Sequence, residues 1–429
     1  MIAALLERAA RRASQADVVL KTDETTRLHF GDDGLHSAAV ATSLGASLRV
    51  VVEGRQGIAG TVVEDPEDLL TRALESARVG DILTPGLPSR AALPSVITHL
   101  PRAAAATLQD LIHLVEILRD RLQTAGLSLN FSVRRSLGSV RVANTHGLDA
   151  GYDVSLVDLR LRATVPTGGR RLTLTGRLVG ADLPSLPELE QLVRSLRLRL
   201  AWATRTVPVP AGRHRVAFSS AALPTLLRPV EQGLNGAAAL LDLSPLAHRR
   251  GARAFSESIT LRDDPLLDGR PGSRPFDDEG LPSRPVALVE RGQIAGLLYD
   301  LETAARAGVP STGHGRRTTF GRAQVVPSNI VLEPGTADEN AVLAAIGDGI
   351  VVERLRGSPD ASQLGGSFAL PALVAWRVLG GEIVGVVPEV TVAGNAHELL
   401  NRVVAVGRDA EWQGSRWLPP VVIEGVSVF

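Results

Sequence analysis

The sequence predicts an α+β fold in two domains, an N-terminal mixed sheet with helices and a C-terminal antiparallel-rich β domain with helices. Three observations predict it. Apolar and polar residues alternate between Leu127 and Leu178, which is typical of antiparallel strands with one solvated face. Segments with the period of amphipathic helices flank this stretch. The periodicity then stops at Thr206–Gly212, where two prolines and a glycine lie close together.

The length of the chain supports the division into two domains. It has 429 residues, whereas single hydrophobic cores stop growing at roughly 250–300 residues. We therefore expect one domain at 1–205 and a second at 206–429.

The N-terminal half combines helix and strand signals. Ile2–Ser14 places its apolar residues on one face of a helix. Asp65 and Pro66 suit the N-cap and first position of a second helix, which reaches Arg78. Short strands broken by acidic turns are expected at Val18–Leu20, Thr26–Phe30 and Gly34–Val40, and a hairpin at Ser47–Glu53 with Ile58–Val63. Two later helices are expected at Leu108–Thr124 and Pro187–Ala201.

The most informative stretch of the C-terminal half is Pro275–Thr319. It opens with an acidic turn, continues as a hairpin and a short helix, and ends in a loop rich in serine, threonine and glycine. These parts are Asp277-Asp278-Glu279-Gly280, Val286–Glu290 with Ile294–Asp300, Leu301–Ala307 before Gly308, and Ser311–Gly315.

Composition excludes several classes of function. Basic and acidic residues number 46 each, so no net field attracts the chain to nucleic acid or to an anionic membrane. Aromatic residues make up 3%, which leaves few surfaces for base stacking. Cysteine is absent, which excludes disulfides, thiolate nucleophiles and Cys-ligated metals. No apolar run approaches the ~20 residues of a membrane span, and the opening residues do not resemble a signal peptide. We expect a cytoplasmic protein.

Three features are candidates for carrying chemistry. The triplet Asp277–Glu279 has the composition of a paired-carboxylate or cation site, but a tight turn whose Asp side chains accept backbone N–H bonds is favoured. His314, between two glycines, either faces a cleft or lies on the surface, and a surface position is favoured. His397-Glu398 lacks a second histidine at ligand spacing, so a solvated helix start is favoured there.

The order of acidic turn, hairpin, helix and loop resembles the TldD/PmbA family, the "modulator of DNA gyrase" proteins. Pro327–Gly335 is similar to the family's PxNxxLxPG segment, and Glu389–Asn395 is similar to its ExTxAGN segment. Val142–Leu148 resembles a weaker N-terminal signature. The resemblance covers most of the chain.

The resemblance implies a function. Catalytic, TldD-type members carry a zinc-binding HExxxH motif on a helix and a downstream cysteine. Here the corresponding helix should lie within Ser219–Leu241, and Arg228–Gly233 stands where the motif would be. No histidine occurs between His214 and His248. The chain therefore resembles the TldE (PmbA) type, without catalytic residues, metal or cofactor of its own.

The same resemblance implies a partner and a substrate. A TldD-type catalytic subunit would hold the zinc, form a heterodimer with this chain and hydrolyse unfolded or flexible peptides. This chain would shape the chamber, where an extended peptide adds as a strand. The candidates for contact with substrate in the cleft are Asp277, Asp278, Glu279, Tyr299 and His314.

Three other functions remain open at this point. The first is a non-enzymatic homodimeric binding or modulator protein. The second is a subunit of a peptide-tailoring hydrolase in a small-metabolite pathway, and the third is a hydrolase that acts on its own. Complex formation with a TldD-type protein and the metal dependence of any peptidase activity separate them.

Overall fold

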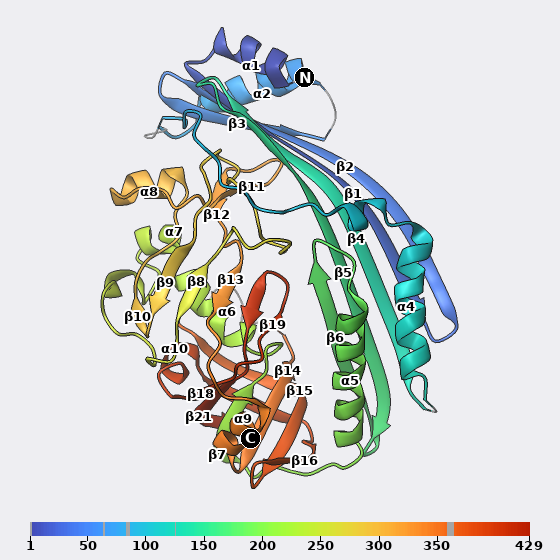
Figure 1. The fold of residues 1–429 in the computed structure, drawn as a ribbon. Coiled ribbons are helices and arrows are strands. Elements are labelled where there is room, and N and C mark those ends of the chain that lie inside the picture. Colours follow the sequence, from blue (N-terminus) through green and yellow to red (C-terminus); the bar gives the residue numbers. More distant parts are fainter. Residues whose placement is uncertain (1, 63–64, 83–85, 125, 358–363) are drawn as a thin grey trace.

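The computed structural model describes residues 2–62, 65–82, 86–124, 126–357 and 364–429. A long, curved antiparallel sheet from the N-terminal half arches over a body of shorter strands and helices from the C-terminal half (Figure 1). The prediction of an α+β fold is confirmed. The division at residues 205 and 206 stays a prediction, although every strand of the long sheet precedes it in sequence.

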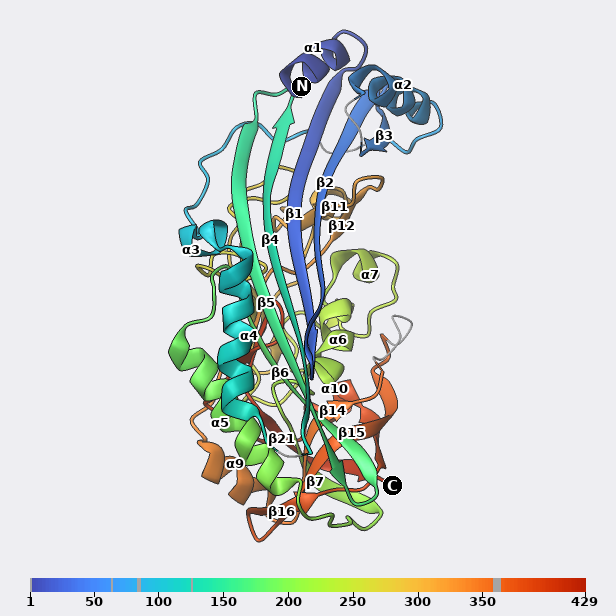
Figure 2. The same cartoon turned by 90° about the vertical axis from the view of Figure 1, so that its right-hand side faces the viewer.

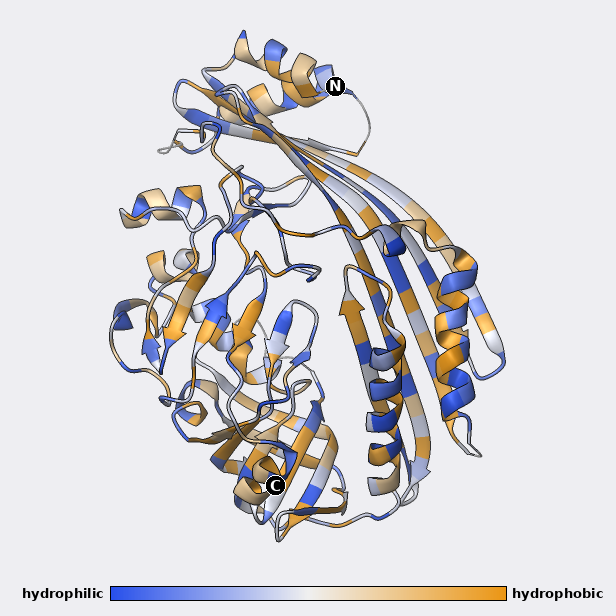
Figure 3. Ribbon diagram, in the orientation of Figure 1, coloured by the Kyte–Doolittle hydropathy of each residue, from blue (hydrophilic) through white to orange (hydrophobic). Residues whose placement is uncertain are grey.

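The N-terminal sheet has six strands in the order β3-β2-β1-β4-β5-β6. Its strands are β1 (Gln15–Gly31), β2 (Gly34–Val52), β3 (Arg55–Thr61), β4 (Ser128–Asn144), β5 (Asp149–Thr167) and β6 (Arg170–Gly180). Hydrophobic and hydrophilic residues alternate along the long strands (Figure 3), as the sequence pattern predicts.

The prediction of short strands broken by acidic turns is wrong. β1 runs without interruption through Asp23 and Glu24, because β2 and β4 pair with it on both sides over nearly its whole length. Ladder hydrogen bonds on both edges outweigh the low strand propensity of two acidic residues. The hairpin of β2 and β3 is confirmed, and Glu53 and Gly54 both take positive φ at its turn.

Helices pack at both ends of this sheet. α1 (Ile2–Ala10) and α2 (Pro66–Ala77) lie with β3 at one end, and α4 (Leu108–Leu122) and α5 (Leu186–Trp202) lie further along (Figures 1 and 2). The short α3 (Pro101–Ala105) precedes α4. The Asp65 carboxylate caps α2 by accepting from the backbone N–H of Asp68, as predicted from sequence. The leucines of α4 and α5 join the inward side chains of β4, β5 and β6 in one apolar core.

The C-terminal body contains two larger sheets and a small one. Their orders are β10-β9-β8-β13-β20-β19, β14-β7-β21-β17-β15-β16 with β18 beside β21, and β11-β12. The strands are β7 (Gly212–Phe218), β8 (Leu261–Asp263), β9 (Val286–Glu290), β10 (Gln293–Ile294), β11 (Gly315–Arg317), β12 (Ala323–Val325), β13 (Ile330–Leu332), β14 (Gly349–Leu355), β15 (Ser367–Leu379), β16 (Glu382–Val386), β17 (Val390–Asn395), β18 (Val403–Val406), β19 (Glu411–Trp412), β20 (Arg416–Leu418) and β21 (Val421–Val428).

Short helices connect these strands. They are α6 (Pro224–Gly233), α7 (Gly236–Leu240), a 3-10 turn (Ala247–Arg249), α8 (Leu301–Ala307), α9 (Glu339–Ile346) and α10 (Ala396–Leu399). α8 has the predicted bounds and ends at Gly308 in the left-handed region, at φ 66°. The predicted hairpin forms between β9 and β10, but its second strand stops at Ile294, so the expected strand over Ile294–Asp300 is too long. No helix in the described parts of the chain is long and apolar enough to cross a membrane.

Candidate functional site

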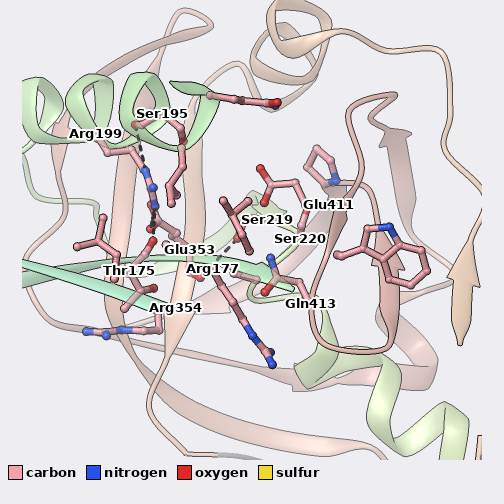
Figure 4. Close-up of a pocket in the computed structure, with 18 of the residues that line it drawn as sticks. Thr175, Arg177, Ser195, Arg199, Ser219, Ser220, Glu353, Arg354, Glu411 and Gln413 are labelled. Carbon is pink, nitrogen blue, oxygen red and sulfur yellow. Dashed lines mark hydrogen bonds and ion pairs between the residues drawn. The ribbon is translucent and has the colours of Figure 1, made fainter. Parts of the chain in front are cut away.

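A cavity of about 1260 Å³ lies between the N-terminal sheet and the C-terminal body. α5 and β6 form one side of it, and residues of β14, β15, β19 and the segment after β7 form the other. Figure 4 shows this space, with Arg199 reaching from α5 toward Glu353, and with Glu411 and Gln413 across from them. The volume is large enough for a short peptide or a drug-sized ligand.

Glu353 is the polar centre of the cavity wall. Its carboxylate accepts a hydrogen bond from Arg199 Nη1 at 2.6 Å and another from Trp376 Nε1 at 2.8 Å. Arg199 also donates to the carbonyl oxygen of Thr175 at 3.0 Å. The Arg199–Glu353 pair therefore joins α5 and β6 to β14, and holds the two halves of the chain at a defined separation across the cavity.

Glu411, at the start of β19, faces the same space. The Glu411 side chain keeps access to solvent, but the surrounding walls remove part of its hydration and raise the pKa of its carboxyl. The charge of Arg199 opposes this shift, and the charge of Glu353 adds to it. A carboxyl with a raised pKa can keep its proton nearer neutral pH and donate it to a carbonyl oxygen of a bound peptide.

The arginines around the cavity differ in their pairing. Arg177 donates to Asp158 at 2.8 Å, and the guanidinium of Arg270 lies 4.9 Å from the ring centre of Trp412. Burial, together with the charge of Arg162, lowers the pKa of Arg354. The Nε of Arg354 has no hydrogen-bond partner among the residues that the structure describes. This part of the wall suits carbonyl or carboxylate oxygens of a ligand.

The acidic turn predicted as a candidate site lies elsewhere, fully buried between the two halves. Asp277 accepts from the backbone N–H groups of Glu279 and Leu281 at 3.0 Å, and from Gly315 at 2.8 Å. The interpretation of this segment as a tight turn is therefore confirmed. Burial and the charge of Glu279 nevertheless raise the pKa of Asp277 to about 7.

The other two acids of the turn bind the long sheet. Asp278 accepts from Lys21 Nζ on β1 at 2.5 Å, and Glu279 accepts from Arg49 Nη1 on β2 at 3.2 Å. Arg49 also donates to Asp17 at 2.8 Å. The turn thus forms a buried ionic junction between residues more than 200 positions apart, which no sequence pattern signals.

His314 and Tyr299 lie beside this junction. The expectation that His314 is at the surface is wrong, since it is fully buried: Nε2 lies 2.8 Å from Asp263 and Nδ1 lies 2.9 Å from the Thr312 carbonyl. Tyr299 is half-buried, and its backbone N–H donates to the Thr312 hydroxyl at 2.7 Å.

The five sequence candidates therefore gather around one region, but the large cavity is lined by other residues. Whether the five contact substrate stays a prediction. Among the elements that line the cavity, the strands within 127–178 and the helix over Pro187–Ala201 were predicted from the sequence, whereas β14 and β19 were not. None of the cavity residues belongs to a motif that the sequence analysis singled out. Only the packing of two distant segments brings Arg199 to Glu353.

Comparison with known proteins places this geometry in a family. Residues 211–429 match the model of the PmbA/TldA metallopeptidase C-terminal domain, and residues 16–77 match that of PmbA/TldA metallopeptidase domain 1. The chain belongs to the PmbA/TldD family. The resemblance drawn from the sequence is confirmed.

Relatives in the PmbA/TldD family match along most of the chain. A metalloprotease of Methanothermobacter thermautotrophicus is 25% identical over 412 residues, covering 93% of this chain and 89% of the relative. A metalloprotease of Synechocystis sp. is 25% identical over 444 residues, covering 96% of this chain and 91% of the relative. The crystal structure of TldE from Thermococcus kodakarensis superposes with a TM-score of 0.90 at 22% identity and covers 99% of each chain, which shows the shared fold.

The matching family models are described as metallopeptidase domains, and the resemblance drawn from the sequence implies a zinc motif on the helix that corresponds to α6. The residues of α6 do not fit such an ion. The Glu231 carboxylate is held by Arg416, with Nε at 2.7 Å and Nη2 at 2.5 Å. Arg228, on the same helix, carries no lone pair for a metal. Within the described ranges, no group of three or more His, Asp or Glu residues is arranged to hold an ion.

Proposed function

We propose that this chain is a non-catalytic, TldE-like subunit of a TldD/TldE-type zinc metallopeptidase. A TldD-type partner supplies the zinc and hydrolyses unfolded or flexible peptides. This chain forms part of the wall of the chamber in which those peptides are held.

One observation carries the proposal. The only carboxylate on α6, Glu231, is neutralised by the two-point ion pair with Arg416. A carboxylate bound in this way is not available as a zinc ligand or as the base for a zinc-bound water. The proposal therefore assigns the chemistry of peptide hydrolysis to another chain.

The cavity supports a role in holding peptides. β6 is an outer strand of its sheet and pairs with β5 alone among the described strands. Residues Thr175–Val179 of β6 line the cavity. An extended peptide added beside β6 would bind through backbone hydrogen bonds, which tolerate many sequences.

The proposal is tested by metal analysis and reconstitution. The purified chain is loaded with zinc, dialysed, and its metal content is measured, alone and after mixing with a TldD-type protein from the same organism. We expect far less than one zinc per copy of this chain and no hydrolysis of an unfolded protein substrate by the chain alone. We expect chelator-sensitive hydrolysis by the mixture.

Three outcomes contradict the proposal. Stoichiometric zinc on the isolated chain would show that it builds its own metal site. Peptidase activity of the isolated chain that survives chelator would show an independent hydrolase. A mixture that neither associates nor gains activity would leave the binding or modulator function as the better description.

A further inference from the structure

Two arginines on opposite walls of the cavity have no carboxylate partner. Arg162 lies on β5 of the long sheet, Arg354 lies on β14 of the C-terminal body, and both line the cavity. In the part of the chain that the structure describes, neither guanidinium forms an ion pair with an acid. Burial and the charge of Arg162 lower the pKa of Arg354, so the two cations repel each other across the cavity.

The acid next to Arg354 is already bound to other donors. Glu353 accepts from Arg199 Nη1 at 2.6 Å through one carboxylate oxygen, and from Trp376 Nε1 at 2.8 Å through the other. Its charge opposes the pKa shift of Arg354 without removing it. Figure 4 shows the Arg354 side chain extending away from the Arg199–Glu353 pair.

The wall formed by β5 and β6 also has positive charge in excess. Arg160 lies directly opposite Arg177 in the ladder between the two strands, and like charges in that position repel. Asp158 accepts from Nη2 of Arg160 at 2.7 Å and from Nη2 of Arg177 at 2.8 Å, so one carboxylate serves two cations. Arg162 lies two residues beyond Arg160, on the same face of β5, and adds a third cation.

The other acids of the cavity lie in a different electrostatic environment. They are Glu188, Glu339, Asp409 and Glu411. None of them acts on Arg354, whose charged neighbours are Arg162 and Glu353. The cavity therefore has a basic part, between β5 and β14, that is separate from its acidic part.

Arg354 also lacks a hydrogen-bond acceptor. The side chain is half-buried, and its Nε is shielded from solvent without a partner among the described residues. Buried donors in native proteins are nearly all paired, so an unpaired one marks a place where the protein does not supply the acceptor. An anionic acceptor would satisfy the arginine and would also offset its repulsion from Arg162.

We propose that Arg162 and Arg354 form a subsite for a carboxylate of the bound peptide, which is either the C-terminus of the peptide or the side chain of an aspartate or glutamate. The inference rests on the proposed function for the nature of the ligand, because carboxylates are the anions that a peptide presents. A guanidinium binds a carboxylate through two parallel hydrogen bonds, and a second cation strengthens the attraction. The subsite gives the cavity a charge preference, which backbone pairing along β6 does not provide.

Four peptides test the subsite on the full-length chain. They share one neutral ten-residue sequence with an acetylated N-terminus, and they differ in a central Glu or Gln and in a free or amidated C-terminus. Binding is measured by isothermal titration calorimetry. We expect at least one carboxylate to lower the dissociation constant about tenfold or more relative to the peptide that has neither. The preference should weaken as the salt concentration rises. Comparison of the four peptides shows whether the C-terminus or the side chain is bound.

Substitutions assign the preference to the two arginines. Arg162→Gln and Arg354→Gln should each remove most of the preference and leave the affinity for the neutral peptide unchanged. Arg356→Gln is the matched control. Arg356 lies just beyond β14, its side chain is 63% exposed and its partner is Glu389, so this variant should keep the preference.

Thermal unfolding separates binding from a structural role. Arg354→Gln removes a repulsion and breaks no ion pair, so without peptide its unfolding midpoint should stay the same or rise. A lower midpoint together with weaker binding of all four peptides would assign Arg354 a structural role and overturn the subsite.

The remaining outcomes also decide the inference. Equal affinities for the four peptides, or a preference that survives both substitutions, would overturn the carboxylate subsite. A chain that binds none of the four would overturn it as well. Zinc analysis and hydrolysis by the reconstituted mixture report separately on the proposed function, so the two failures are distinguishable.

Discussion

The guanidinium of Arg49, on β2, lies 3.2 Å from the carboxylate of Glu279, which is 230 residues further along the chain. Both side chains are almost fully buried, and Arg49 also donates two hydrogen bonds to Asp17. Arg317, from β11, approaches the same aspartate. This junction holds the long sheet against the C-terminal body. Arg199 and Glu353, on the cavity wall, form a separate contact between the two halves of the chain.

Removal of Arg49 should destabilise the protein strongly. Arg49→Met leaves Glu279 without its cation and Asp17 with fewer donors, and breaking a buried ion pair costs about 3–5 kcal/mol. Urea denaturation followed by circular dichroism measures the loss. Arg72→Met is the control: its partner Asp68 is exposed, and we expect a change below about 0.5 kcal/mol. Equal effects of the two substitutions would show that the junction contributes little.

The stability should depend on pH through Asp277. Its pKa is raised from 3.8 to about 7 by burial and by the charge of Glu279. Between about pH 4 and 7 the folded chain therefore binds this proton more tightly than the unfolded chain, so the free energy of unfolding falls as the pH rises through that window.

Asp277→Asn tests this dependence. We expect the variant to be less stable overall, because an amide cannot accept all the backbone hydrogen bonds of the carboxylate. Its free energy of unfolding should nevertheless change less between pH 4.5 and 7 than that of the unaltered protein, by up to about 1 kcal/mol per pH unit. Parallel pH profiles for the two proteins would contradict the raised pKa.

The ion pair on α6 should be structural. Arg416→Met leaves the buried Glu231 carboxylate without its partner, and we expect a loss of about 3 kcal/mol in the free energy of unfolding. The double variant Glu231→Gln/Arg416→Met should recover part of that loss, because no charge stays buried. Zinc retained after dialysis should be equally low in both. Zinc binding that appears in Arg416→Met alone would show a latent metal site on α6.

The charges around Glu411 should set its titration. Glu353→Gln removes a charge that raises the pKa of Glu411, and Arg199→Met removes one that lowers it. The midpoint of the pH dependence of tryptophan fluorescence, reported by the neighbouring Trp412, should move to lower pH in the first variant and to higher pH in the second. Glu411→Gln should abolish the transition. Midpoints that move together would indicate a general loosening of the cavity instead.

The parts of the protein that depend on local interactions could be predicted from the sequence. Helices α2 and α8 are specified by capping residues at their ends, Asp65 and Gly308, and the turn at Asp277 is specified by backbone N–H groups close in sequence. The order of the motifs was enough to identify the family. In each case the deciding hydrogen bonds or residues are neighbours in the chain, so their spacing is visible in the sequence.

Features that depend on distant partners emerged only from the folded chain. β1 passes through Asp23 and Glu24 as one strand because β2 and β4 supply ladder bonds on both sides. The cavity exists because α5 and β14 meet at Arg199 and Glu353, which are 154 residues apart. His314 is buried against Asp263, which lies 51 residues away in the sequence. Spacing along the chain cannot predict such contacts, because burial and charge pairing act between whichever segments the tertiary structure brings together.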